Sequence, residues 1–407
     1  MEMETLHKRV AGIDVHRMKH VVTVLIEDGT GQIGKHTREF GGFKRDLKAL
    51  AAWLLELSVE LAILESTGIY WKSVHAHLEN AGLVVWVVNA HHVKHVPGRK
   101  TDVADSEWLA QLGRFGLVRA SFIPPRDLRE LRLVSRYRKK LGDMLAAEKN
   151  RLHKLLDDAG IKLGGLVADI NGRAASDIVD GLIDGLSPTA LIQRAGRLRA
   201  PKEALLASLD GDLSARHILL LTELRSHLRD LEARQAKLDA YLVEAMQPYA
   251  WAHRLLQTIP GIDEIAAAMI LVEIGDDLTR FGSADRLASW AALCPGNHES
   301  AGKKKSGKTR KGNTTVRYLL CEAANAARRT KTVFHAKYQG LVVRRGHKKA
   351  IVALAHKLIR TIYFMLTRRQ AYRDSGFDYA AANVKKNAPR WLKALKRFGY
   401  WPEAVAA

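Results

Sequence analysis

The stretch Val10-Ala-Gly-Ile-Asp-Val15 decides the fold, because it is a short apolar, β-branched run that carries a single carboxylate, Asp14. The next segment, His20–Ile26, is also rich in Val and Ile. Asp28-Gly29 then predicts a turn into a third and more polar strand, Gln32–Phe40. Three consecutive strands joined by short connections predict a meander at the start of the chain.

Helices and strands alternate after this meander. We expect a helix over 43–57, a buried strand Val59–Leu64, a helix over 70–81, a strand Leu83–Val88 and a helix from about 102 to 114. Three strands followed by alternating helix and strand is the order of an RNase H-like, or RuvC-like, α/β sandwich. The sequence therefore predicts such an α/β domain over residues 1–123.

Four acidic residues lie where this fold would bring them together. Asp14 lies on the first strand, Glu65 ends the fourth, and Asp102 and Asp105 are three apart at the start of the last helix. Carboxylates suit Mg²⁺, which binds a few of them together with substrate phosphates, and two such ions about 4 Å apart support both reacting oxygens of a phosphodiester. The alternative is that these acids only cap a turn and a helix, although a ligand at a helix start can also cap. Glu107 is expected to point away from Asp102.

The charge of the chain indicates a polyanionic partner. The formal charge is +22 over 407 residues, which is enough chain for two or three domains. Residues Asn297–Arg390 contain 23 Lys and Arg against four Asp and Glu, a net of +19. This asymmetry favours a nucleic-acid surface. A membrane surface is the other polyanion to weigh, but no strong amphipathic anchor accompanies the charge.

Cysteine content and hydropathy restrict the compartment. Cys294 and Cys321 are the only cysteines, which excludes a disulfide framework and a Cys-rich zinc site. The first residues lack the apolar core of a secretory signal, and no uninterrupted apolar stretch approaches the roughly 20 residues that span a bilayer. We expect a soluble, cytoplasmic protein with no membrane partner.

From Pro124 the pattern becomes helical and predicts a coiled-coil connector over 124–247. One long helix is expected to reach about residue 158, and a Gly-rich, variable section follows over 160–210. The second long helix has a heptad seam whose one polar member is Gln235: Leu221, Leu224, Leu228, Leu231, Gln235, Leu238, Leu242 and Ala245. The two helices can pair with each other or with another subunit. We expect a mixture of both, with a homo-oligomer as the result.

A basic, mainly helical domain is predicted over 248–407. Residues 255–274 resemble a helix–hairpin–helix, in which Pro260-Gly261 breaks the first helix and the start of the second can accept a phosphate. A Gly- and Lys-rich loop covers 294–313, and basic amphipathic helices are expected over 314–329 and 350–369. The loop has six cationic residues that we expect to bind nucleic-acid phosphates: Lys303, Lys304, Lys305, Lys308, Arg310 and Lys311.

Two hydroxyls of this loop, those of Ser300 and Ser306, could attack phosphorus. A serine needs a base or a metal to become a useful nucleophile, and no base can be identified from spacing. Composition therefore leaves open which serine reacts. It also leaves open a basic loop that binds the nucleic-acid backbone without any chemistry.

Several blocks of the sequence together resemble one family. They are Gly12-Ile-Asp-Val-His16, Leu64-Glu-Ser-Thr-Gly-Ile-Tyr-Trp71, Lys100-Thr-Asp-Val-Ala-Asp105, Ile259-Pro-Gly-Ile262, Leu293-Cys-Pro-Gly296, Ser300-Ala-Gly302 and Lys311-Gly-Asn313. In these blocks the chain resembles the DEDD insertion-sequence transposases of the IS110 family, in particular the IS1111 subgroup. The resemblance covers nearly the whole chain.

The resemblance implies a RuvC-like nuclease domain, a coiled-coil connector and a C-terminal transposase domain. It implies Mg²⁺-dependent cleavage and rejoining of donor and target DNA through a serine nucleophile, which corresponds to Ser300, with Ser306 as the fallback. A bridge RNA from the element itself would pair with the DNA. Assembly as a dimer or tetramer, with the acids and the serine of different subunits in one composite site, is also implied.

Two other functions stay open from the sequence. One is a RuvC-like junction endonuclease that hydrolyses DNA with metal-activated water, in which the serine is only structural. The other is a non-catalytic nucleic-acid-binding protein whose acidic residues cap turns.

Overall fold

The computed structural model describes residues 5–66, 68–89, 93, 105–196, 198–296, 298–300, 303–306, 309 and 311–400. The chain divides into two compact units, Met1–Arg126 and Asp127–Ala407. The second unit contains both the predicted connector and the predicted C-terminal domain.

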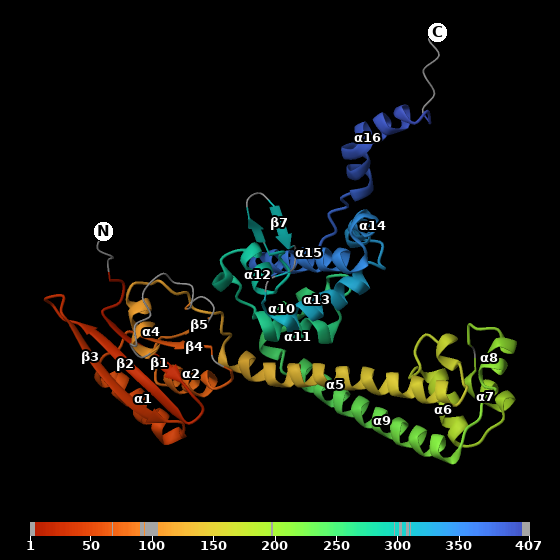
Figure 1. Ribbon diagram of the computed structural model, residues 1–407, viewed down its shortest axis with the longest axis horizontal. Coiled ribbons are helices and arrows are strands. Elements are labelled where there is room, and N and C mark those ends of the chain that lie inside the picture. The colour runs from red at the N-terminus through yellow and green to blue at the C-terminus, as the bar shows by residue number, and fades with distance from the viewer. Residues whose placement is uncertain are drawn as a thin grey trace, which may run out of the picture. The chain divides into compact units, whose positions relative to one another are not determined.

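The N-terminal unit is built on a five-stranded sheet with the order β3-β2-β1-β4-β5 (Figure 1). The strands are β1 (Arg9–Val15), β2 (Lys19–Glu27), β3 (Ile33–Gly41), β4 (Leu61–Glu65) and β5 (Val85–Val88). The first three are antiparallel neighbours, whereas β4 runs parallel to β1 and β5 parallel to β4. This topology confirms the predicted RNase H-like fold.

Helices cover both faces of this sheet. Helices α1 (Lys44–Glu56) and α2 (Trp71–Asn80) pack on one face and α4 (Asp105–Arg114) on the other. Ile13 and Leu64 are buried on the α1 side, whereas Val10 and Ile63 are buried on the α4 side. Successive residues of a strand face opposite ways, so each central strand contributes to two apolar cores.

Two glycines allow α4 to lie directly on the sheet. A Cβ on Gly12 of β1 would lie 1.8 Å from the carbonyl oxygen of Ser106 and 2.6 Å from the amide nitrogen of Ala110. A Cβ on Gly113 of α4 would lie 2.2 Å from Cδ1 of Ile63. The absence of a side chain at each position is therefore what sets the close approach of helix and strand.

The second unit begins with two long helices, α5 (Arg126–Asp158) and α9 (Ala215–Glu244). They run antiparallel, because Arg138 pairs with Asp239 whereas Asp158, twenty residues further along α5, pairs with His217. The predicted seam faces inward: Leu221, Leu228 and Leu231 are buried in a core shared with leucines of α5. Pairing within the chain is thus confirmed, and pairing with another subunit stays a prediction.

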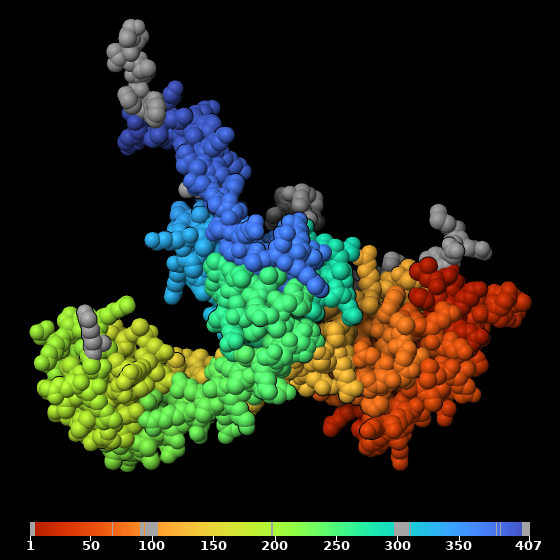
Figure 2. All heavy atoms as spheres, turned by 180° about the vertical axis from the view of Figure 1, so that it is seen from behind, coloured from red at the N-terminus to blue at the C-terminus, as the bar shows by residue number. Residues whose placement is uncertain are grey.

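The section 160–210 is more regular than its glycine content predicts. It contains α6 (Arg173–Ile183), α7 (Pro188–Ala195) and α8 (Lys202–Ser208), which pack on the far ends of α5 and α9 as a rounded lobe (Figure 2). Arg225 of α9 is buried and donates to both oxygens of Asp180 on α6, at 2.9 and 3.1 Å. This ion pair fastens the lobe to the long helix.

A helical bundle forms the rest of the second unit. Its helices are α10 (Ala250–Gln257), α11 (Glu264–Ile274), α12 (Ala284–Trp290), α13 (Thr314–Ala327), α14 (Val333–Arg345), α15 (His347–Arg368) and α16 (Tyr379–Arg397). Helix α15 is long and apolar enough to cross a membrane by length and composition alone. Its residues Leu354, Leu358 and Ile362 are fully buried in the bundle, and α15 packs against α12, α13 and α14. It is therefore a core helix.

We predict that Gly12→Ala destabilises the N-terminal unit by about 3 kcal/mol or more, because the new methyl group meets backbone atoms of α4 that cannot rotate away. Gly29→Ala is the matched control, since a Cβ there has no atom within 4 Å, and it should stay within about 0.5 kcal/mol of wild type. Urea unfolding followed by circular dichroism measures both. Equal unfolding midpoints for the two variants would contradict the close packing of α4 on β1.

Candidate active site

Two of the predicted acids lie at one edge and on one face of the sheet. Strands β1 and β4 are parallel neighbours in which Gly12 pairs with Ile63 and Ile13 with Leu64. Asp14 and Glu65 are the next residues at the carboxyl ends of these strands, and both side chains are partly buried. Asp14 is two residues after Gly12, and Glu65 is two residues after Ile63. Each acid therefore faces the same side of the sheet as Gly12 and Ile63, toward α4. The two carboxylates therefore lie beside each other on the α4 face.

Helix α4 brings a third acid to the same end. Its Ser106 lies against Gly12, whereas its Gly113 lies against Val10, so the helix runs opposite to β1. The Ser106 hydroxyl is 2.8 Å from the hydroxyl of Thr23 on β2. Asp105, the first residue of α4, consequently lies toward the carboxyl end of β1, where Asp14 is. The fourth predicted acid, Asp102, lies outside the described residues.

His16 is a neighbour of Asp14 that the sequence reasoning missed. Its Nε2 lies 3.1 Å from Oδ2 of Asp14, and His16 directly follows the end of β1. Within the ranges described above, no group of three or more His, Cys, Asp or Glu side chains is close enough to hold a metal ion. The donor set still fits Mg²⁺, which prefers carboxylate oxygens and keeps positions for water and phosphate. Glu107, the acid expected to point elsewhere, pairs with Lys35 of β3.

The predicted basic loop 294–313 contains a short β-hairpin, which corrects the expectation of a loop throughout. Strand β6 (His298–Ser300) pairs antiparallel with β7 (Lys303–Ser306). Ser300 pairs with Lys303 next to the turn, whereas Ser306 pairs with His298 at the base. The hairpin therefore holds the two candidate serines at opposite ends. Of the six predicted phosphate-binding cations, Lys308 and Arg310 lie outside the described residues.

The base of the hairpin is anchored on the bundle through the motif Lys311-Gly-Asn313. A Cβ on Gly312 would lie 2.5 Å from the carbonyl oxygen of Trp290, so only glycine permits this approach. The amide nitrogen of Asn313 donates to the same carbonyl at 2.9 Å. The Asn313 side chain accepts from the amides of Thr315 and Val316 at 3.0 and 3.1 Å and so caps α13.

A buried carboxylate completes this anchor. Glu273 of α11 is fully buried and accepts from Arg136 of α5 at 2.8 and 3.1 Å. It also accepts from Nδ2 of Asn313 at 2.8 Å and pairs with Arg132 at 3.2 Å. Burial alone would raise the pKa of Glu273, but the hydrogen bond from Arg136 and the charges of both arginines lower it. Sequence reasoning missed this residue, although an acid near the end of a long apolar run was a visible signal.

The predicted helix–hairpin–helix corresponds to α10, a turn at Gly261 with φ +88°, and α11. Its second helix begins at a cap formed by the chain itself, because Oδ1 of Asp263 accepts from the amide of Ala266 at 2.7 Å. A phosphate contact at this helix start stays a prediction.

Two models of known protein families match the chain. A transposase model for the DEDD domain of the IS110 family matches residues 11–161, and a model of the transposase IS116/IS110/IS902 family matches residues 253–339. The chain belongs to the IS110 family of transposases. The first match contains the acidic edge of the sheet, and the second contains Glu273, the hairpin and its anchor.

Individual relatives agree with this family. A "probable family 20 transposase" of Pseudomonas aeruginosa is 28% identical over 310 residues, which are 75% of this chain and 82% of that protein. The transposase for insertion sequence element IS1111A of Coxiella burnetii is 33% identical over 123 residues, 29% of this chain and 34% of that protein. Among solved structures, Thermus thermophilus RuvC is similar over 28% of this chain and 99% of its own, at 16% identity and a TM-score of 0.22.

We predict that Glu273→Ala destabilises the second unit by about 3–5 kcal/mol, because it leaves buried arginine charge without its partner. Since the pKa of Glu273 is lowered in the folded protein, its stabilisation is complete above pH 4.5 and is lost as the pH falls through the lowered value. The difference in free energy of unfolding between wild type and variant, measured with urea, should therefore become smaller in acid.

Asp157→Ala is the control for this variant, because Asp157 forms an exposed ion pair with Lys162. Such pairs contribute about 0–1 kcal/mol. A Glu273→Ala variant that unfolds at the same urea concentration as this control would show that the buried network is not a support of the bundle.

Proposed function

We propose that this transposase is a Mg²⁺-dependent DNA recombinase that cleaves and rejoins strands through Ser300. The observation that carries the proposal is the common edge of Asp14 and Glu65, with Asp105 of α4 directed to the same end. Acids gathered at one end of an RNase H-like sheet suit metal-assisted phosphodiester chemistry. Membership of a transposase family makes DNA the substrate.

Each residue of the proposed site has a separate role. Asp14, Glu65, Asp102 and Asp105 would hold Mg²⁺, which when bound supplies positive charge to the scissile phosphate. The Ser300 hydroxyl oxygen attacks phosphorus, the bond from phosphorus to one strand oxygen breaks, and the serine proton ends on that leaving oxygen. A hydroxyl of another strand then displaces the serine and restores the proton to it. No phosphodiester is hydrolysed, so its bond energy is conserved for rejoining.

The partners follow from the charge and the family. Cations of the hairpin region, Lys303, Lys304, Lys305, Lys308, Arg310 and Lys311, would bind phosphates near the serine. We propose a bridge RNA that pairs with donor and target DNA, so that the protein recognises backbone and shape while base pairing selects the sequence. A homo-oligomer, a dimer or a tetramer, acting in the cytoplasm would bring the acids of one subunit to the serine of another.

We predict that a covalent protein–DNA adduct forms with wild type and is lost in Ser300→Ala, because only the attacking oxygen is removed. Ser306→Ala is the matched control at the other end of the hairpin and should retain the adduct. The measurement is denaturing electrophoresis of end-labelled element DNA after incubation with guide RNA and Mg²⁺. An adduct in Ser300→Ala and none in Ser306→Ala would transfer the role to Ser306. Cleavage with no adduct in any variant would instead support hydrolysis by water.

We predict that Asp14→Asn, Glu65→Gln and Asp105→Asn each reduce cleavage at least about a hundredfold while DNA binding is retained, because an amide oxygen carries no charge for the metal. Glu107→Gln, which removes an acid two residues from Asp105, should leave cleavage within about twofold of wild type. Cleavage rates with Mg²⁺ and with EDTA, beside a mobility-shift assay, check this. An Asp105→Asn variant as active as the Glu107→Gln control would remove Asp105 from the metal site.

A further inference from the structure

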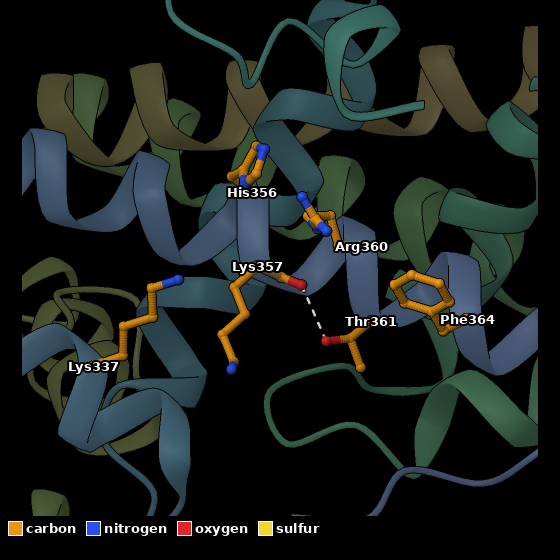
Figure 3. Close-up of a pocket in the computed structure, with 6 residues that line it drawn as sticks. All are labelled: Lys337, His356, Lys357, Arg360, Thr361 and Phe364. Carbon is orange, nitrogen blue, oxygen red and sulfur yellow. Dashed lines mark hydrogen bonds between the residues drawn. The ribbon is translucent and has the colours of Figure 1, made fainter. Parts of the chain in front are cut away.

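A basic pocket lies between α14 and α15, away from every residue assigned above. It has a volume of about 350 Å³ and is lined by Lys337 of α14 and by residues of α15: His356, Lys357, Arg360, Thr361 and Phe364. Figure 3 shows the Lys337 side chain extending from its own helix toward α15. The lining residues are partly buried except Phe364, whose side of the pocket is open and apolar.

The polar groups of the pocket are held in place by neighbours. Lys357 donates to the hydroxyl of Tyr379 at 3.0 Å, and Thr361 donates to the carbonyl oxygen of Lys357 at 3.0 Å (Figure 3). Arg360 pairs with Asp285 of α12, whose side chain is 70% exposed. These contacts orient the cations on α15 before any ligand arrives, which lowers the entropy cost of binding one.

Positive charge is in excess at Lys337. Burial and the nearby charges of Lys357 and Arg360 lower the pKa of Lys337 to about 8. Burial, Arg360 and Lys337 likewise lower the pKa of His356, and Asp285 opposes this. Asp374 lies within electrostatic range of Lys357 but is exposed. These like charges repel one another, so an anion bound between the two helices would stabilise the pocket.

A nucleic-acid phosphate fits this chemistry best. Two ammonium groups and a guanidinium line one recess, and charge-assisted hydrogen bonds to phosphate oxygens are the strong ones. The apolar wall formed by Phe364, 40% exposed, suits a sugar or an unpaired base, which duplexes do not present to a recess. The surrounding segment has a net charge of +19 over Asn297–Arg390, which draws a polyanion to this surface.

We propose that this pocket binds a backbone phosphate of a single-stranded nucleic-acid segment, with Lys337, Lys357 and Arg360 as its ligands. The proposal rests on the proposed function only in taking a nucleic acid as the partner. The segment can be RNA or displaced DNA, since the phosphate is common to both.

The first test measures binding of full-length protein to labelled 20-nucleotide single-stranded RNA, to DNA of the same sequence and to the 20-base-pair duplex, over a series of KCl concentrations. Lys337→Gln should weaken single-strand binding about tenfold and reduce the slope of log K against log salt by about 0.7, the value for one phosphate contact. Lys348→Gln removes the same charge from an exposed position at the start of α15 and should change affinity less than twofold. Equal losses in both variants, or a duplex bound as well as either single strand, would overturn the proposal.

The second test uses the pKa of Lys337. Its charge is complete below pH 7 and lost above about 8, so wild-type affinity should fall up to about tenfold between pH 7 and 9. Lys337→Arg keeps its charge over this range and should lose less than twofold. If Lys337→Arg does not fold, Lys357→Gln is measured instead. Removing the like charge of Lys357 should move the midpoint of the affinity decrease to a higher pH than in wild type. The same pH profile in wild type and both variants would overturn the assignment of Lys337.

These binding measurements are independent of strand cleavage. A protein that forms no serine adduct can still show the Lys337-dependent slope and pH profile, so failure of the proposed chemistry and failure of the pocket are separable. Which single strand binds more tightly decides whether the ligand is RNA or DNA.

Discussion

The second unit depends on one buried carboxylate. Glu273 lies inside an almost entirely buried helix and is shared by two arginines of α5 and by Asn313 at the start of α13. A charge in an apolar interior costs several kcal/mol unless it is paired and hydrogen-bonded. Here every side chain that pairs with it comes from another helix or its cap. The register of three segments is therefore set by a single group, which apolar packing alone would not specify.

This constraint extends to the hairpin that carries the candidate serines. Asn313 caps α13 with its side-chain oxygen and donates to Glu273 with its side-chain nitrogen, while its backbone amide binds the end of α12 at Trp290. Asn313 thus joins α11, α12 and α13 at the base of the hairpin, and Glu273 links this group to α5. A hairpin rich in lysine and glycine has little apolar surface of its own, so its position must come from its base. The part of the serine segment that packs on the bundle is its anchor.

The sequence predicted those features that depend on local periodicity. The apolar runs Val10–Val15 and Leu61–Leu64 predicted strands with an acid near the end of each, and the three-and-four spacing of leucines in α9 predicted its buried face. Gly12 lies two residues before Asp14, but the α4 backbone at Ser106 and Ala110 that it contacts lies almost a hundred residues later and could not be paired with it by pattern. Helices α6 to α8 were missed because glycines and prolines in 160–210 mark their ends rather than disorder.

Contacts between segments distant in sequence were not predictable. Glu273 is 137 residues from Arg136 and 40 from Asn313, and nothing in either segment indicates the other. The hairpin was missed because Lys303–Ser306 lacks the apolar alternation that identifies a strand in a sequence. Its pairing with His298–Ser300 is seen only in the structure. Lys357 reads as an ordinary cation of the amphipathic helix expected over 350–369, and Lys337 lies in a stretch for which no helix was predicted. Only the packing of α14 on α15 places them in one recess.

The two proposed sites share one physical property, which is that each gathers side chains of like charge. Carboxylates at the edge of the sheet repel one another until a cation separates them, and the cations of the pocket repel until an anion enters. In the part of the chain that the structure describes, which leaves out Asp102, the acids share an edge and do not form a group of three metal-ligating side chains. In the proposed function, the active site would be complete only when metal and nucleic acid are both bound. Repulsion between like charges would then favour the proposed ligand at each site.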